Sequence, residues 1–354
     1  MSRKPSTSLE TPIERMQRLG VEFWNDSCRL SELEHAIEQG AAGGTSNPVI
    51  VSAAVEAEPG RWESSIDRLL RERPKDGADE IAWALMEEVA KAAAAVLEPR
   101  FRKSRGREGL LCAQVDPRLH DDSRRMVAQG RRLAALAPNV AVKIPATQAG
   151  LKAMRGLISH RVPVNATVCF TVSQAVACAE AMERALRPAR LAVPAYVTIM
   201  VGRLDDHLKR LLARDKASIE ADACDWAGIA VFKRALEVFR RRKFASRLLV
   251  AAYRHERHWT ELVGPGIVQS IPYSWWTKFN ESDLEPAATL DRPVDPKVVL
   301  SLLDAFPDFR RAYEEDGLAP AEFERYGASA HTLEQFIGAY HNVLDVVRRR
   351  MSAA

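Results

Sequence analysis

The sequence predicts an α/β fold, a closed (β/α)8 TIM barrel of alternating strands and helices with a C-terminal helical extension. Three observations indicate it. Short apolar runs bounded by turn residues occur eight times, and segments with helical signals separate most of them. The 354 residues are 47% hydrophobic and 28% charged, which suits one large core.

The chain divides into three expected parts. Residues 1–11 are polar and predict a disordered tail. Residues 12–279 carry the strand and helix pattern of the barrel, and its first helix begins with Thr11 as N-cap and Pro12 at the first position. Residues 280–354 contain helical segments but lack strands, so we expect a helical extension packed on the barrel, over its mouth.

The elements follow from local signals, namely apolar runs for strands and caps or apolar periodicity for helices. The expected strands are 21–26, 42–48, 110–116, 141–147, 162–170, 191–201, 247–254 and 266–272. The expected helices are 12–19, 32–39, 62–71, 79–97, 121–136, 150–158, 173–186, 222–242, 296–305 and 333–350. Residues 49–109 hold more helix than one crossover needs, so an extra helix is expected there.

A lysine lies in the middle of the fourth strand. Lys143 is surrounded by apolar residues, with Pro138 and Asn139 before the run and Gly150 after it. Burial penalises the ammonium and lowers its pKa, which would leave a free amine able to attack a carbonyl. The alternative is a lysine near the strand end whose ammonium reaches out to pair with a carboxylate.

Polar side chains also stand at the carboxyl ends of other strands, where the catalytic residues of such barrels lie. They are Asp26, Asn47, Gln114, Asn165, Thr167, Thr198, Arg203 and Arg254. Each of them alone could be a satisfied core group or a cap. Together with Lys143 they predict a polar site built around an amine.

Composition and charge narrow the function classes. The net charge of +4 is small, and the basic clusters at 240–243 and 348–350 fall at helix ends, so they do not indicate nucleic acid as a partner. The five cysteines form no CxxC pair, which is typical of reduced thiols. With neither a signal peptide nor a membrane-spanning run recognised, we expect a cytoplasmic protein without membrane contact.

Two further patterns in the sequence are weak evidence for a metal site and for a phosphate loop. His255 and His258 are three residues apart, but further ligands are missing from the sequence around them, so no metal site is expected. The Gly264-Pro265-Gly266 turn lacks the following Lys-Ser or Lys-Thr of a phosphate loop.

Four motifs carry a resemblance to the transaldolase family. They are Gly44-Thr45-Ser46-Asn47-Pro48, Val142-Lys143-Ile144-Pro145-Ala146-Thr147 followed by Gly150, Asn165-Ala166-Thr167 with Phe170, and Val201-Gly202-Arg203 with Asp205. The resemblance extends from about Glu14 to Trp276. It implies a class I aldol mechanism in an eight-stranded barrel, with no metal and no organic cofactor.

The resemblance also implies roles for the site residues. Lys143 resembles the lysine that forms the Schiff base, and Asp26 the carboxylate that takes the proton from the sugar C4 hydroxyl. Asn47 and Asn165 resemble the amides that hold the retained three-carbon unit. Thr167 resembles the hydroxyl that orders the catalytic water, and Thr198 stands where the family has a serine that binds dihydroxyacetone. Arg203 and Arg254 resemble the pair that binds the substrate phosphate.

Three positions depart from the family pattern. Gln114 stands where transaldolases have a proton-shuttling glutamate, and a glutamine can only orient the water. The related fructose-6-phosphate aldolases resemble this chain in having glutamine there. Met200 replaces an aromatic residue of the acceptor pocket, and Ala252 replaces a serine near the phosphate. These differences predict an altered rate or substrate range.

The resemblance predicts a transaldolase of the pentose phosphate pathway and of carbohydrate metabolism. Such a transferase moves dihydroxyacetone from sedoheptulose 7-phosphate or fructose 6-phosphate to glyceraldehyde 3-phosphate or erythrose 4-phosphate. One alternative is an aldolase that releases dihydroxyacetone. The other is a non-catalytic barrel that binds sugar phosphates. The expected partners are sugar phosphate substrates and a second copy of the chain in a homodimer.

Overall fold

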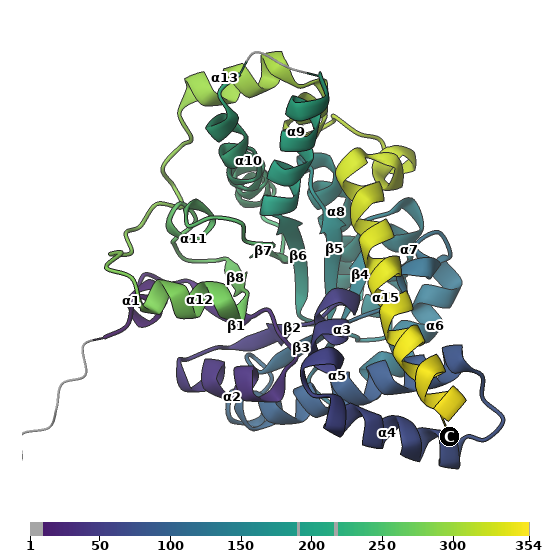
Figure 1. Cartoon of the computed structure of the whole chain (residues 1–354). Helices are drawn as coiled ribbons and strands as arrows, with labels where there is room; N and C mark the ends of the chain where they lie inside the picture. The colour runs from purple at the N-terminus through teal and green to yellow at the C-terminus, as the bar shows by residue number, and fades with distance from the viewer. Residues whose placement is uncertain (1–9, 190–191, 216–218, 354) are drawn as a thin grey trace, which may run out of the picture.

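The computed structural model describes residues 10–189, 192–215 and 219–353 (Figure 1). Eight parallel strands form a closed barrel in the order β1-β2-β3-β4-β5-β6-β7-β8, which confirms the predicted fold class. Most of the expected tail, residues 1–9, lies outside the described residues, as do 190–191 at the edge of the sixth expected strand.

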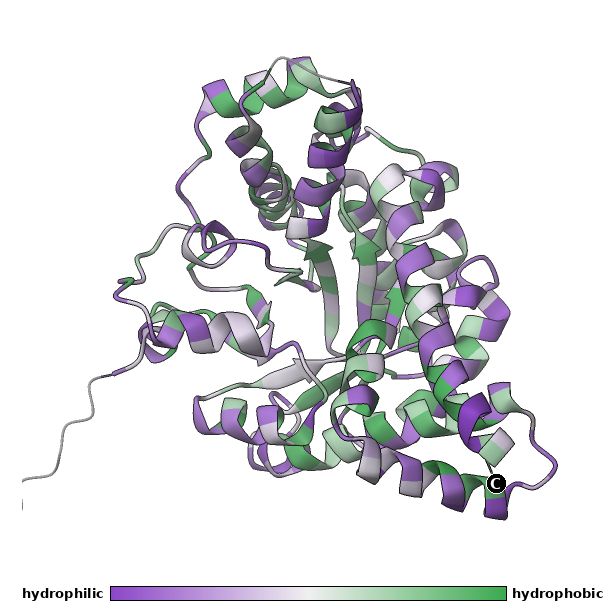
Figure 2. Cartoon of the chain, in the orientation of Figure 1, coloured by the Kyte–Doolittle hydropathy of each residue, from purple (hydrophilic) through white to green (hydrophobic). Residues whose placement is uncertain are grey.

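The strands are short and largely buried, as expected when helices cover the outside of a barrel. Their bounds are β1 Glu22–Asn25, β2 Gly43–Thr45, β3 Leu110–Gln114, β4 Val140–Pro145, β5 Val164–Cys169, β6 Ala195–Met200, β7 Arg247–Ala251 and β8 Val268–Ile271. Each lies within its predicted run, except that β4 begins one residue earlier. Figure 2 shows the predominantly apolar character of the strands.

The helices of the barrel wall follow the strands. They are α1 Pro12–Arg18, α2 Leu30–Glu38, α3 Pro48–Ala57, α4 Pro59–Glu72, α5 Ala78–Lys103, α6 Ser123–Ala134, α7 Gln148–Ser159, α8 Val172–Ala189, α9 Val201–Asp215, α10 Ala227–Arg242, α11 Arg257–Thr260 and α12 Tyr273–Asn280. Short 3-10 turns, η1 Pro117–Leu119 and η2 Ala221–Trp226, precede α6 and α10. Three helices, α3, α4 and α5, lie between the second and third strands, where more helix than one crossover needs was expected.

Some local predictions were wrong. Helix α9 is absent from the predicted helices, because the sequence predicts a sixth strand that ends at Gly202 and Arg203, whereas Val201 already begins the helix. The second helix begins at Leu30, two residues before its predicted start, with Arg29 at the N-cap position. Helix α8 begins at Val172, one residue before its predicted start, and the Thr171 hydroxyl accepts a hydrogen bond from the Gln174 amide at 3.0 Å.

The barrel interior consists of two layers. The lower layer is apolar and includes Trp24, Leu110, Ala141, Tyr196 and Val268. At its base an ion pair joins Glu22 to Arg247 at 2.6 Å, and the Trp24 indole donates to Glu22 at 2.8 Å. The lower layer is therefore filled by side chains and closed at its base by a satisfied ion pair, whereas the lysine lies in the carboxyl-end layer above it.

The C-terminal extension contains α13 Pro296–Ala305, α14 Pro307–Tyr313, η3 Pro320–Arg325 and the long α15 Gly327–Ala353. Helix α15 packs against α3, α5 and α9 (Figure 1). Its Tyr340 is buried and stacks on Trp83 of α5, with ring centroids 5.5 Å apart. The extension thus lies against helices that follow two different strands, β2 and β6, beside the carboxyl end of the barrel.

Candidate active site

Lys143 occupies the inner face of β4, where side-chain alternation places it above Ala141. It is 4% exposed, and its amine forms no hydrogen bond or ion pair with the part of the chain that the structure describes. Burial lowers the pKa of the amine below its usual value, and Arg203 adds to this, while Asp26 opposes it. The amine is therefore easier to deprotonate than a surface lysine.

Strand register places two amides on either side of the lysine. Gln114 of β3 and Asn165 of β5 are both directly paired with Lys143. The Gln114 Oε1 atom is buried and has no hydrogen-bond partner among the described residues. The Asn165 Oδ1 atom accepts a hydrogen bond from Thr198 of β6 at 2.7 Å, and its Nδ2 donates to Cys112 Sγ at 3.4 Å.

Asp26 directly follows β1 and is held by a chain of hydroxyls. Thr45 of β2 donates a hydrogen bond to Asp26 Oδ1, and the Thr45 and Ser270 oxygens are 2.7 Å apart. Since the Thr45 proton goes to the carboxylate, Ser270 donates to Thr45. Burial raises the pKa of Asp26 above its usual value, against the opposing effects of Lys143, Thr45 and the two arginines. A carboxylate with a raised pKa is a better general base.

Thr167 and Asn47 lie at the edges of this group. Thr167 is fully buried, pairs with Pro145 across β4 and β5, and has its hydroxyl 4.0 Å from the Met200 sulfur. Next to it, Val168 has a positive φ of 53°, where the register between β5 and β6 shifts, as bulges near active sites do. Asn47 caps α3, and its Oδ1 accepts from the Ile50 amide at 3.1 Å, so its NH₂ group and one lone pair of Oδ1 remain for a ligand.

The two arginines form the cationic side of the site. Arg203 is in the first turn of α9, and burial together with the neighbouring Arg254 lowers its pKa to about 10. Its guanidinium lies 5.3 Å from the Phe336 ring of α15 and donates a hydrogen bond to Gln335. Arg254 follows β7, is exposed, and forms an ion pair with Asp206 at 2.8 Å.

The structure therefore brings the predicted residues to one end of the barrel. Lys143, Gln114, Asn165 and Thr198 are joined by strand register or hydrogen bonds, and the charges of Asp26, Lys143 and Arg203 act on one another. Asn47 is less available than expected, because its oxygen is used in a cap.

Sequence reasoning missed several contributors, which are Thr45, Ser270, Cys112, Asp206 and Gln335. Ser270 was detectable in principle, because alternation from Val268 places it on the inner face of β8. Gln335 has no local signal, because it is 132 positions from Arg203 along the chain.

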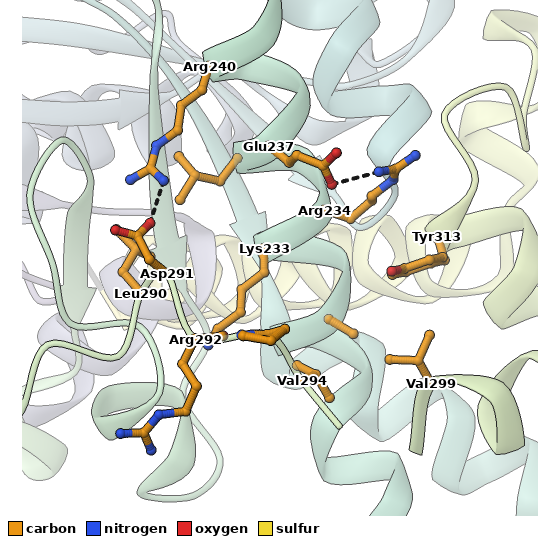
Figure 3. Close-up of a pocket in the computed structure, with 13 residues that line it drawn as sticks. Lys233, Arg234, Glu237, Arg240, Leu290, Asp291, Arg292, Val294, Val299 and Tyr313 are labelled. Atoms are coloured by element: carbon orange, nitrogen blue, oxygen red, sulfur yellow. Dashed lines mark hydrogen bonds and ion pairs between the residues drawn. The ribbon is translucent and has the colours of Figure 1, made fainter. Parts of the chain in front are cut away.

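A pocket on the outside of the barrel does not carry a comparable group among the described residues. The pocket in Figure 3 lies on α10 beside the 290–294 segment. Within it Arg240 pairs with Asp291, Arg234 pairs with Glu237, and Lys233 donates to two backbone oxygens. Because these cations are already paired, the pocket is a weaker candidate for a site than the barrel end.

Comparison with known proteins agrees with this geometry. Residues 23–315 match the family described as Transaldolase/Fructose-6-phosphate aldolase. The chain belongs to this family. The match spans all eight strands and supports an enzyme of the aldolase or transaldolase type.

Curated relatives are similar at modest identity. Transaldolase 1 of Streptomyces avermitilis is 27% identical over 296 residues, covering 73% of this chain and 77% of the relative. The transaldolase of a Parafrankia species is 25% identical over 384 positions, covering 98% and 100%. That of Campylobacter jejuni is 30% identical over 200 residues, covering 53% and 59%. Among the described residues, no helix has the length and hydrophobicity needed to cross a membrane.

Proposed function

We propose that the protein is a transaldolase that transfers a dihydroxyacetone unit between sugar phosphates through a Schiff base on Lys143. The observation that carries the proposal is a buried amine with a lowered pKa, between two amides and within the electrostatic reach of Asp26 and Arg203. A free amine attacks the C2 carbonyl of a ketose, and loss of water from the carbinolamine gives an iminium. Sugar phosphates are the substrates that the sequence predicts.

Asp26 would serve as the base for carbon–carbon cleavage. It takes the proton from the C4 hydroxyl, the C3–C4 bond breaks, and the electron pair moves into the iminium to give an enamine. The aldehyde fragment leaves, and an aldose acceptor reverses the steps. The Thr45–Ser270 chain keeps the Asp26 carboxylate oriented throughout.

The amides and hydroxyls would hold the three-carbon unit and the water. Thr198 donates its proton to Asn165, so it offers only lone pairs to a substrate hydroxyl, while Asn165 keeps one N–H for that purpose. Gln114 Oε1 has no hydrogen-bond partner among the described residues and belongs to the residue paired with Lys143 across β3 and β4, so it is suited to orienting a water, and the Thr167 hydroxyl is the second group proposed to order it.

Arg203 and Arg254 would bind the phosphate. The positive charges of Arg203 and Arg254 repel each other, and a bound phosphate dianion would reduce this repulsion. Asp206 neutralises part of this charge through its ion pair with Arg254. Arg254→Ala is expected to raise the KM for glyceraldehyde 3-phosphate about tenfold and to leave the KM for glyceraldehyde unchanged.

Borohydride trapping tests the chemistry directly. Incubation with fructose 6-phosphate and borohydride should add a reduced three-carbon or six-carbon adduct to the peptide that contains Lys143, and Lys143→Ala should show none. An adduct on another lysine, or no adduct, would show that the amine has no catalytic role. If no adduct forms on any lysine, the non-catalytic sugar-phosphate-binding barrel would be the better description.

The second candidate is an aldolase that releases dihydroxyacetone, which Gln114 favours because the fructose-6-phosphate aldolases resemble this chain in having glutamine at that position. Product analysis with fructose 6-phosphate alone separates the two. A transferase gives at most one dihydroxyacetone per site, held on the enzyme, until an aldose is added. Sustained release of free dihydroxyacetone would identify the aldolase. A donor and acceptor screen then tests the place in the pentose phosphate pathway.

A further inference from the structure

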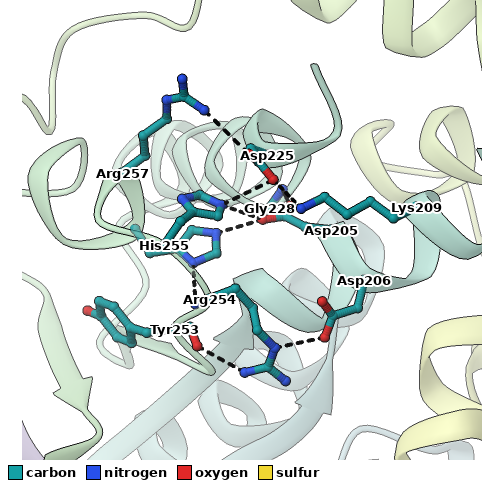
Figure 4. Close-up of polar contacts among 10 residues, drawn as sticks. Asp205, Asp206, Lys209, Asp225, Gly228, Tyr253, Arg254, His255 and Arg257 are labelled. Carbon is teal, nitrogen blue, oxygen red and sulfur yellow. Dashed lines mark hydrogen bonds and ion pairs between the residues drawn. The ribbon is translucent and has the colours of Figure 1, made fainter. Parts of the chain in front are cut away.

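A largely buried cluster of polar side chains lies next to Arg254, one of the two arginines (Figure 4). Asp205 of α9 is fully buried and accepts three hydrogen bonds, from the Gly228 amide at 2.8 Å, from His258 Nε2 at 2.7 Å and from His255 Nε2 at 3.2 Å. Although its burial alone would raise its pKa, the pKa of Asp205 is lowered by these histidines and donors. The carboxylate is therefore the centre of a hydrogen-bonded unit.

The hydrogen bonds also determine the tautomer of His258, which is fully buried. Its Nδ1 accepts a hydrogen bond from the backbone N–H of Arg254 at 3.1 Å. The neutral ring must therefore carry its proton on Nε2, which points at Asp205. Asp205, His255 and His258 are close enough together to hold a metal ion, but a His258 nitrogen that keeps this proton cannot ligate one.

The cluster ties the two arginines to each other. Asp205 is two residues after Arg203 on α9, and His258 binds the backbone of Arg254, so the chain Asp205–His258–Arg254 spans from α9 to the β7–α11 loop. We propose that Asp205 and His258 are positioning residues that set the separation of Arg203 and Arg254 for a sugar phosphate. This inference rests on the proposed role of both arginines in phosphate binding.

Backbone packing at the same junction supports a fixed geometry. A Cβ on Gly202 would lie 2.2 Å from the Ala252 carbonyl oxygen and 2.5 Å from Arg254 Cγ. Ala252 itself has a φ of 66°, in the left-handed region that L-residues rarely adopt. Its oxygen accepts a hydrogen bond from the Gly202 amide at 3.1 Å. The loop that carries Arg254 is thus held against α9 at closer range than side chains allow, in a conformation that the surroundings must stabilise.

Three variants test the proposal. His258→Leu removes both hydrogen bonds. His258→Gln can keep both, since its amide oxygen accepts from the Arg254 N–H and its NH₂ donates to Asp205. His255→Leu is the matched control, because it removes an Asp205 contact from the same cluster but none to the Arg254 backbone.

The measurement is the KM and kcat of each variant with glyceraldehyde 3-phosphate and with glyceraldehyde as acceptor. His258→Leu should raise the KM for the phosphorylated acceptor roughly tenfold, with kcat and the KM for glyceraldehyde nearly unchanged. His258→Gln should recover most of the loss, and His255→Leu should change the ratio of the two KM values little. An equal effect on both acceptors, or equal effects of both leucine variants, would overturn the proposal.

A second readout separates this inference from the proposed function. Borohydride trapping of unphosphorylated dihydroxyacetone on Lys143 does not involve the arginines, so it should proceed equally in the wild type and in all three variants. Its absence in the wild type would refute the Schiff-base function. If His258→Leu does not fold, Asp205→Ala replaces it, because alanine leaves no acceptor for His258 Nε2; the same KM ratio is expected, and a ratio equal to that of the wild type would overturn the inference.

Discussion

At the scale of single residues, the function depends on the protonation of Lys143. Its pKa in the folded state is below 10.5, because burial disfavours the ammonium more than Asp26 stabilises it. The value of kcat/KM should therefore rise with pH as the amine loses its proton, with a midpoint lower than that of an ordinary lysine. A pH–rate profile of donor cleavage measures this, and a midpoint at or above 10.5 would contradict it.

The same shift has a consequence for stability. Between the lowered folded pKa and 10.5 the unfolded chain binds more protons than the folded one, so the unfolding free energy rises with pH in that window. Below the folded pKa the full cost of burying the charge remains. Lys143→Met removes this cost, and we expect it to raise the unfolding free energy at pH 7 by about 1 kcal/mol. Urea unfolding at pH 7 and pH 10 measures the gain, which should shrink at the higher pH.

Asp26 provides a residue-scale test of the cleavage step. Asp26→Asn keeps the size of the side chain and an acceptor for Thr45 but removes the base. We expect kcat for donor cleavage to fall by about 10²–10⁴-fold. Borohydride trapping should still yield an adduct with dihydroxyacetone, which has no C4. A loss of less than tenfold would assign the proton transfer to another group.

Sequence reasoning reached individual residues only where a local pattern marked them. Lys143 was recognisable because a charge interrupts an apolar run, and Asp26 because it ends a strand. The links that tune these groups, Thr45 to Asp26 and Gln335 to Arg203, join segments 19 and 132 positions apart. Such contacts depend on the barrel closing, and no local signal in the sequence encodes them.

At the scale of elements, the strands were predictable because each is a short apolar run between turn residues. Helix α9 was not, because its first turn, Val201 to Leu204, continues directly from β6 without a loop. Burial of both the strand and the first turn leaves no change in hydropathy at the boundary. This is why Arg203 was expected at a strand end and is found in the first turn of a helix.

The junction between β4 and α7 offers an element-scale prediction. The Thr147 hydroxyl accepts a hydrogen bond from the Gly150 amide at 3.0 Å, and a Cβ on Gly150 would lie 1.9 Å from the Pro145 oxygen. Gly150→Ala should therefore push α7 away from the strand that carries Lys143 and reduce the unfolding free energy by about 1–3 kcal/mol. Thermal and urea unfolding measure this. Gly338→Ala, at a helical site where a Cβ meets nothing within 4 Å, is the control and should not destabilise.

At the scale of the whole molecule, the extension determines what surrounds the barrel end. Helix α15 was expected to pack on the barrel from its apolar residues, but its register could not be predicted, because a long helix can slide along a groove with little change in pattern. The structure fixes that register through several separate contacts. Tyr340 packs on Trp83, Ser329 accepts from Gln174 at 3.1 Å, and Arg350 pairs with Asp67.

This register places Gln335 against Arg203, so a substitution on α15 should affect phosphate binding at the barrel end. Gln335→Glu places a carboxylate against the Arg203 guanidinium, where it would compete with a bound phosphate. We expect the KM for glyceraldehyde 3-phosphate to rise about tenfold and the KM for glyceraldehyde to remain unchanged. Glu334→Gln on the same helix is the control, because Glu334 is exposed and contributes only an opposing charge near His331. Equal KM values for Gln335→Glu and the wild type would show that α15 lies too far from the bound phosphate to influence it.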